Sequence, residues 1–100
     1  MSITILNEFK ALPGNFEALT EIFRRIVTQI RTVEGNERCE MLLRVADGDS
    51  DDERLIILET WTSIEAHQRA ATAVDPKDFS AIMALLSEKP TGRYYQPIDS

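Results

Sequence analysis

Cysteine, histidine and tryptophan each occur only once in this chain of 100 residues. A single cysteine excludes an internal disulfide and a cysteine-based metal cluster. Cys39 lies on the apolar face of a predicted strand, so we expect a buried small side chain rather than a reactive thiol. Basic residues are also scarce, because 11 Lys and Arg stand against 17 Asp and Glu, giving a formal net charge of -6. This balance does not suit the phosphate backbone, so we expect no nucleic-acid partner.

Long apolar runs are missing as well. No stretch approaches the roughly 18 apolar residues of a membrane-spanning helix. The N-terminal MSITILNEFK lacks the basic start and apolar core of a signal peptide. We therefore expect a cytoplasmic protein with no membrane partner. The length of 100 residues predicts one domain over 1–100, small enough to gain stability by burying more surface in a dimer.

Three segments have the pattern of β-strands. Apolar and polar residues alternate over 3–9 and 37–46, and a short apolar run rich in β-branched side chains, 55–58, starts a third strand that continues to about 61. Between 16 and 33 the apolar residues instead recur at helical spacing. That segment predicts an amphipathic helix ending near Gly35, a residue type that commonly follows a helix.

Two further helices are predicted by their starting residues. Thr62 or Ser63 can cap a helix that follows the third strand directly. Asp75-Pro76 combines a capping side chain with proline at the first helical position, so another helix should start there. Pro90 and Gly92 are expected to end it.

A last strand is predicted over 93–98, at an edge of the sheet because it contains proline. The resulting order is strand, helix, strand, strand, helix in two pieces, strand. This is the split βαβ, ferredoxin-like α+β arrangement with an antiparallel sheet. One sheet face would take the helices, while the other would carry Leu6, Leu42 and either Leu58 or Ile57. We therefore expect two such sheets to pack together as a homodimer.

The segment 47–53 is the most acidic run, and its first three alternate aspartates have the spacing that opens a calcium-binding loop. The match then fails, because Asp52 replaces the required glycine and Leu58 stands where a bidentate carboxylate belongs. A solvated hairpin loop is the better interpretation, and no metal site is expected.

The candidate site residues gather around the junction of the third strand and the helix that follows it. Trp61 stands at the mouth of this junction, and His67 shares a helix face with Ile64 and Ala71. Asn7 interrupts the apolar face of the first strand, and a buried amide must find a partner. That partner is either a loop or a water molecule, or the polar group of a ligand.

Other polar residues could join such a site. Glu59 lies two positions before the tryptophan on the same strand face, and it can pair with Arg93 or Arg38 or line a cavity. Tyr94 and Tyr95 point to opposite faces, so one of them can reach the pocket or a dimer partner.

Several segments together resemble a known family. LPGNFEAL follows the first strand, VEG ends the first helix, and ILETWTSIEAH spans the junction. This pattern is similar to the antibiotic biosynthesis monooxygenase (ABM) family of dimeric α+β barrels, whose hallmark is an acid-x-Trp-x-Ser-x-x-Ala segment. Here the segment is Glu59-Thr60-Trp61-Thr62-Ser63-Ile64-Glu65-Ala66, and the resemblance covers about residues 3–98.

The resemblance implies several activities. Family members include cofactor-independent monooxygenases of quinol-like or polycyclic aromatic substrates, haem-degrading enzymes and enzymes of small signalling molecules. The haem-degrading branch uses a strand Asn, matched by Asn7, an aromatic residue where this chain has Ala70, and a later His. The stretch 79–86 contains no histidine, so iron would lack its axial ligand. We therefore expect neither haem nor any other cofactor.

The family reading predicts a cofactor-independent monooxygenase that oxidises a small electron-rich aromatic with O2 in a pocket between sheet and helices. The substrate would supply the electrons, as a phenolate or enolate. His67 would be the base, and Asn7 would hydrogen-bond a ring oxygen. Trp61 would stack on the ring. The remaining substrate-binding candidates are Glu59, Phe79 and Met83.

A second interpretation uses the same residues without chemistry. A lone histidine on a helix face is often structural, and a tryptophan at a strand end usually belongs to the core. The chain would then be a non-catalytic, small-molecule-binding or auxiliary α+β barrel dimer. Fold alone does not separate these two functions.

Overall fold

The computed structural model describes residues 2–45 and 53–99. These residues form four strands, three α-helices and one short 3₁₀ turn, η1. The elements are β1 (Ile3–Phe9), α1 (Phe16–Ile30), β2 (Asn36–Arg44), β3 (Arg54–Trp61), α2 (Ile64–Ala70), η1 (Ala71–Ala73), α3 (Pro76–Leu85) and β4 (Thr91–Tyr95). Most of the acidic segment 47–53, predicted to be a hairpin loop, lies outside the described residues.

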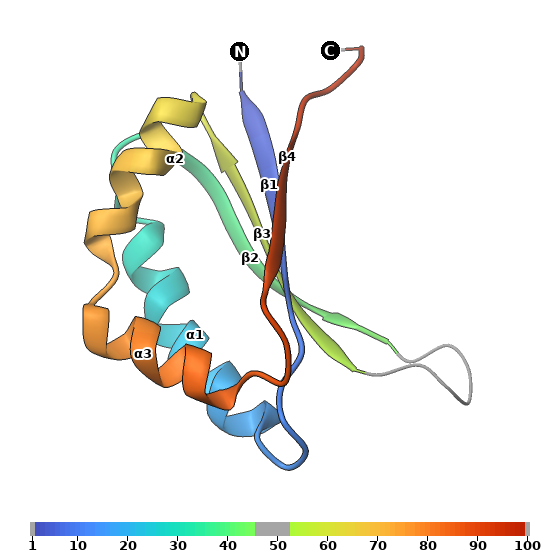
Figure 1. Cartoon of the computed structure of the whole chain (residues 1–100). Helices are drawn as coiled ribbons and strands as arrows, with labels where there is room; N and C mark the ends of the chain where they lie inside the picture. The colour runs from blue at the N-terminus through green and yellow to red at the C-terminus, as the bar shows by residue number, and fades with distance from the viewer. Residues whose placement is uncertain (1, 46–52, 100) are drawn as a thin grey trace.

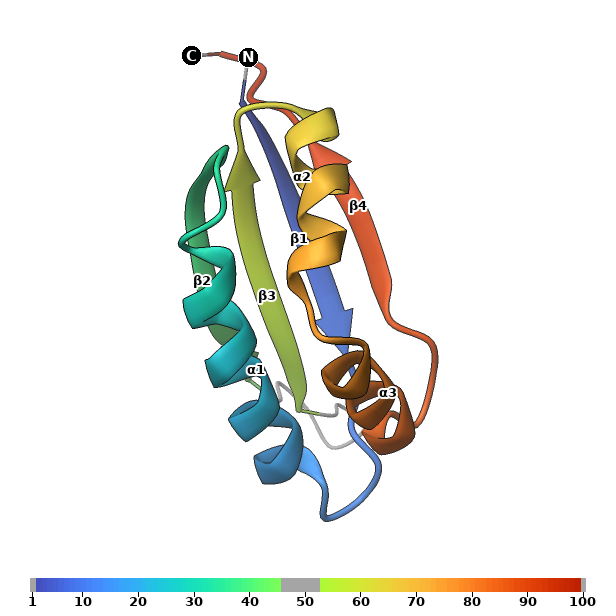
Figure 2. The ribbon, with the colours of Figure 1, turned by 90° about the vertical axis from the view of Figure 1, so that its left-hand side faces the viewer.

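The four strands form one antiparallel sheet in the order β2-β3-β1-β4. Figure 1 shows all three helices on one face of this sheet, and Figure 2 shows them from the helix side. The predicted α+β, ferredoxin-like fold is therefore confirmed. No helix among the described residues is long and apolar enough to cross a membrane, and the cytoplasmic location stays a prediction.

The strand register determines which side chains meet on the helix side. One row across the sheet, in strand order, consists of Cys39, Glu59, Ile5 and Tyr94. The next row consists of Met41, Ile57, Asn7 and Gly92. Successive rows on one face are two residues apart because side chains alternate along a strand. Glu59 and Asn7 are therefore diagonal neighbours on adjacent strands.

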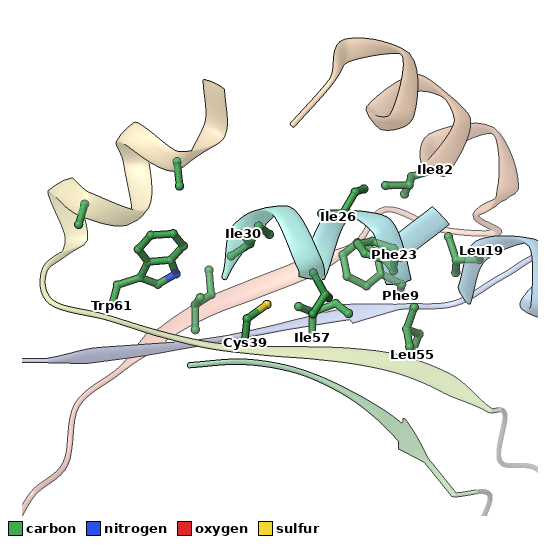
Figure 3. Close-up of a cluster of buried hydrophobic side chains, with 14 of the residues drawn as sticks. Phe9, Leu19, Phe23, Ile26, Ile30, Cys39, Leu55, Ile57, Trp61 and Ile82 are labelled. Carbon is green, nitrogen blue, oxygen red and sulfur yellow. The ribbon is translucent and has the colours of Figure 1, made fainter. Parts of the chain in front are cut away.

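The core lies between this sheet face and α1, whose apolar residues recur at helical spacing. The buried side chains of α1 are Leu19, Phe23, Ile26, Val27 and Ile30. Figure 3 shows Phe23 of α1 beside Phe9 of β1, and their ring centroids are 4.6 Å apart. Burying each large apolar side chain contributes roughly 1.5–3 kcal/mol, so this stripe fixes α1 on the sheet.

The end of α1 differs from its prediction. The helix ends at Ile30 because the next amides, Thr32 and Val33, donate to carbonyls three residues back and form tight turns. Gly35 follows these turns with a φ of +94° and starts the path into β2. A Cβ at Gly35 would lie 2.8 Å from the Cβ of Ala66 in α2. Glycine is thus favoured by its positive φ and required by the close approach to α2, while α1 itself ends five residues earlier, at Ile30.

The starts of the other two helices follow capping chemistry. Ser63, one of the two predicted caps, precedes α2, and its Oγ accepts a hydrogen bond from the N–H of Ala66 at 3.1 Å. Thr62 precedes this cap. Asp75 caps α3 as predicted, accepting from the N–H of Lys77 at 2.8 Å.

The last strand also differs from its prediction. It covers Thr91–Tyr95 rather than 93–98, so Gly92 lies inside it. A Cβ at Gly92 would lie 2.5 Å from Oδ1 of Asn7 on β1, the strand beside it. Gly92 therefore makes room for a neighbouring side chain and does not end α3 as predicted, because α3 already ends at Leu85. β4 is an edge strand, as predicted.

Helix α3 is fastened differently at its two ends. At its C-terminal end, the amides of Leu12 and Ser87 donate hydrogen bonds of 2.8 and 2.9 Å between the segment after β1 and the segment ending α3. Near its N-terminal end, Arg25 of α1 and Asp78 form an ion pair of 2.8 Å. These contacts hold α3 over the sheet.

Candidate functional site

A cavity of about 620 Å³ lies between the sheet and the helices. Its polar side chains include Asn7 of β1, Glu59 of β3 and His67 of α2. Phe79 and Met83 of α3 line it from the helix layer, and both are partly exposed. The cavity thus has mainly apolar walls and a small polar group, as small-molecule sites commonly do.

Glu59 is the centre of the polar group. It is only 6% exposed. Asn7 Nδ2 donates to its Oε2 at 3.1 Å, and the indole Nε1 of Trp61 donates to its Oε1 at 2.9 Å. Both contacts follow from the fold, because Asn7 is a diagonal neighbour and Trp61 lies two residues along β3 on the same side.

The environment of Glu59 makes its carboxyl a weaker acid than an exposed one. Burial raises the pKa of Glu59 above its ordinary value. The hydrogen bond from Trp61, the nearby His67 and the hydrogen bond from Asn7 act in the opposite direction. The site therefore holds an ionisable group whose raised pKa increases its basicity when it is ionised.

His67 joins this group from the helix side. Its Nε2 lies 4.0 Å from Oε1 of Glu59, and its Nδ1 lies 2.7 Å from the hydroxyl of Tyr94 on β4. The His67 ring lies 5.7 Å from the ring of Trp61 and meets Tyr94 edge-on at 5.4 Å between centroids. A second hollow of about 350 Å³, also lined by Glu59, His67 and Tyr94, adjoins this point.

The structure brings together five of the six predicted site residues as lining of one cavity: Asn7, Glu59, His67, Phe79 and Met83. Trp61 is not among the lining residues. Its side chain is wholly buried, and Figure 3 shows its ring between β3 and α2. Trp61 therefore reaches the site through its N–H on Glu59, with no ring face open for stacking.

The register also decides between the alternatives for Glu59 and the tyrosines. Arg38 lies opposite Thr60, on the other sheet face, and pairs with Glu40, so it is not the partner of Glu59. Tyr94 is the tyrosine that reaches the site. Strand alternation predicts that one of the two tyrosines reaches the pocket or a dimer partner. The hydrogen bond to His67 could not be predicted from it, because that bond depends on where β4 lies in the sheet.

Cys39, which faces the same side as Glu59, takes no visible part in the site. It is 2% exposed, as predicted for a small core side chain. Burial, and next the charge of Glu59, raise the pKa of its thiol to about 12. Cys39 is therefore a neutral thiol at physiological pH.

The fold and the site define a ferredoxin-like α+β protein with a ligand-sized cavity between its two layers. The family model of antibiotic biosynthesis monooxygenase matches residues 2–81. The chain belongs to the antibiotic biosynthesis monooxygenase family, as its junction segment suggested. No curated protein matches the sequence significantly.

Solved structures share this fold over nearly their whole length. Rv0793 from Mycobacterium tuberculosis has a TM-score of 0.80 at 16% identity, with 100% of this chain and 98% of that chain covered. SnoaB, a cofactor-independent oxygenase from Streptomyces nogalater, has a TM-score of 0.75 at 19% identity, with 99% and 95% covered. A conserved protein from Methanosarcina mazei Go1 has a TM-score of 0.80 at 13% identity, with 96% and 92% covered. At these identities the likeness establishes the fold.

Proposed function

We propose that the protein is a cofactor-independent monooxygenase that oxidises a small electron-rich aromatic, such as a quinol, with O2. The observation that carries this proposal is the cavity in which Asn7, Glu59 and His67 meet between apolar walls. The family supports it, and so does the likeness to SnoaB, which is itself a cofactor-independent oxygenase.

The chemistry needs little from the protein beyond binding and proton transfer. A phenol that loses its proton becomes a phenolate, which is electron-rich enough to reduce O2 directly. The cavity supplies ionisable groups at Glu59 and His67 for that proton, and Glu59 among them is buried.

The other lining residues would bind and orient the ring. Asn7 uses one hydrogen of its amide on Glu59, which leaves the second for a ring oxygen of the substrate. Phe79 and Met83 would contact the ring from α3, since a thioether and an aromatic ring both pack well on flat aromatic surfaces.

We also propose that this single-domain chain acts as a homodimer through the sheet face without helices. On that face Leu6 of β1 lies opposite Leu58 of β3, and Leu42 of β2 lies opposite Ile56 in the next row. Leu42 is exposed and Leu6 and Leu58 are only partly buried. A second sheet would cover these side chains.

Oxygen uptake tests the function. The protein is mixed with a panel of hydroquinones and anthrones, and O2 consumption and product formation are followed. We expect turnover above the uncatalysed rate for at least one compound, reduced in Asn7→Ala and His67→Ala but retained in Arg69→Ala, an exposed α2 substitution outside the cavity. Ligand binding without O2 consumption across the panel would instead support the non-catalytic interpretation.

A further inference from the structure

We propose that Glu59 takes the proton from the substrate, and that His67 and Tyr94 are positioning residues that keep the Glu59 carboxylate ready to accept it. This inference rests on the proposed function and changes the role that the sequence suggested for His67. It comes from the hydrogen-bond pattern around the imidazole.

The contacts of His67 favour one tautomer. Its Nδ1 lies 2.7 Å from the hydroxyl of Tyr94, and a phenol donates to an imidazole nitrogen more readily than it accepts from one. Its Nε2 lies 4.0 Å from Oε1 of Glu59, and a ring N–H is electrostatically preferred there over a lone pair. The neutral imidazole therefore carries its hydrogen on Nε2 and accepts from Tyr94 at Nδ1.

In this tautomer His67 has no free nitrogen lone pair for the substrate. Nδ1 is occupied by the hydroxyl of Tyr94, and Nε2 already holds a hydrogen. Glu59 retains capacity, because each carboxylate oxygen accepts one hydrogen bond from the protein, from Asn7 or from Trp61, and can accept another. Glu59 also lines both the main cavity and the adjoining hollow.

Titratable groups surround Glu59 from α2, β4, β2 and the segment after α1. His67 on α2 and the hydroxyl of Tyr94 on β4 lie on the cavity side. Cys39 on β2 is its register neighbour, a neutral thiol whose pKa is raised, and Arg31 after α1 donates to the carbonyl of Cys39. Burial raises the pKa of Glu59, which makes the ionised carboxylate a stronger base than an exposed one.

The proposed step balances with O2 as the co-reactant. Glu59 takes the hydroxyl proton of the phenol, leaving the bonding electron pair on the substrate oxygen. The resulting phenolate carbon gives two electrons to O2 and forms a carbon–oxygen bond to it. Glu59 returns the proton to the peroxide, and loss of the carbon-bound hydrogen with cleavage of the O–O bond releases water. The substrate thus loses two hydrogens and gains one oxygen, and the carboxylate is regenerated.

A measurement without turnover tests the ionisation of Glu59 directly. Trp61 is the only tryptophan, and its N–H bonds to Glu59, so its fluorescence in the ligand-free protein should report the ionisation of this carboxyl. His67→Asn removes the imidazole, whose interaction lowers the pKa of Glu59, so we expect the transition to shift to higher pH. The double variant E59Q/H67N should show none. A flat titration in His67→Asn would contradict an ionisable Glu59 and overturn the proposal.

Turnover then tests the role. With a quinol that the parent protein oxidises, we expect Glu59→Gln to lower kcat by about 10²–10⁴-fold, the usual contribution of a general base. His67→Asn and Tyr94→Phe should each lower it less and move the acidic limb of kcat/KM, while Tyr95→Phe should leave that limb in place. If Glu59→Gln is active and His67→Asn is inactive, the proposed role of Glu59 is wrong, while the proposed function still stands. A parent protein that oxidises no compound would contradict the proposed function, and the base with it.

Discussion

Gly92 has no side chain, and this leaves room for the Asn7 amide in the polar group of the cavity. Gly92 lies beside Asn7, and a Cβ there would come within 2.5 Å of the amide oxygen. That oxygen is the end of a side chain, so it can move at little cost to the backbone. Such a movement would take the amide away from Glu59, its hydrogen-bond partner.

We therefore expect Gly92→Ala to lower turnover or ligand affinity several-fold while changing the free energy of unfolding by less than about 1 kcal/mol. The reason is that the added methyl displaces the Asn7 amide without opening the core. Oxygen uptake and urea unfolding together check this. Thr91→Ala on the same strand, opposite Glu8, is the matched control and should behave as the parent does. Parent-like turnover in Gly92→Ala would show that the Asn7 orientation does not matter.

Glu59 should reduce stability at neutral pH. Burial holds its folded-state pKa above the ordinary value, so its contribution to stability is fully present below the unfolded-state pKa and is lost as the pH rises through the folded-state pKa. At pH 7 the buried carboxylate is therefore a cost, which Glu59→Gln removes.

We expect Glu59→Gln to melt at a higher temperature than the parent at pH 7, with the difference shrinking as the pH falls through the folded-state pKa and vanishing below about 4, where the folded and unfolded carboxyls are both protonated. Thermal unfolding from pH 4 to pH 8 measures it. Glu65→Gln, on the exposed side of α2, is the control and should show no such trend. A Glu59→Gln variant that melts below the parent at pH 7 would show that the hydrogen bonds to the carboxylate outweigh its burial.

Among the elements, the meeting of α1, β3 and α2 depends on one backbone position. The carbonyl of Gly35 accepts a hydrogen bond of 2.9 Å from the N–H of Thr62, just after β3. The missing Cβ of Gly35 allows Ala66 of α2 to pack directly against its backbone. This contact places α2, and with it His67, over the sheet.

Gly35→Ala should therefore destabilise the protein by about 1–3 kcal/mol of backbone strain plus about 1–3 kcal/mol of overpacking. Gly14→Ala is the matched control, because Gly14 also has a positive φ, +81°, but has open space around it. Gly14→Ala should therefore lose only the part of the stability that comes from backbone strain. Urea unfolding measures both variants, and equal losses would mean that the contact with Ala66 relaxes freely.

The elements themselves were largely predictable because strand alternation, helical spacing and capping residues are local signals. The site was less so. The pairing of Asn7 with Glu59 depends on the register between β1 and β3, which no local pattern encodes. Gly92 was predicted to help end α3, yet it lies in β4 and its role is a tertiary contact with Asn7. Trp61 suggested a stacking surface, but its burial directs only the N–H to the site.

At the scale of the whole molecule, the sheet has one face covered by helices and one without them among the described residues. The uncovered face carries Leu6, Leu42 and Leu58 in a contiguous arrangement. Because apolar side chains there gain free energy from leaving water, the proposed dimer would add to the stability of each subunit.

Gel filtration with light scattering should therefore give a mass near twice the 11.3 kDa of the chain. Leu42→Asp should shift the protein to the monomer mass, since a charge would be buried between the sheets. Ile64→Asp changes a similarly exposed apolar residue in the helix layer and should leave the mass unchanged. A monomeric parent at micromolar concentration would contradict the dimer.

The unequal fastening of α3 has a consequence for how the cavity admits its ligand. Backbone hydrogen bonds made by Leu12 and Ser87 hold the C-terminal end of α3. A partly exposed ion pair, Arg25 with Asp78, helps hold the N-terminal end. Salt screens the ion pair but not the backbone bonds. Rising ionic strength should therefore accelerate hydrogen exchange of the amides in the first turn of α3, while the amides of Leu12 and Ser87 should remain protected. The cavity would then open transiently on the side nearest η1, with α3 pivoting about its C-terminal end at Leu85.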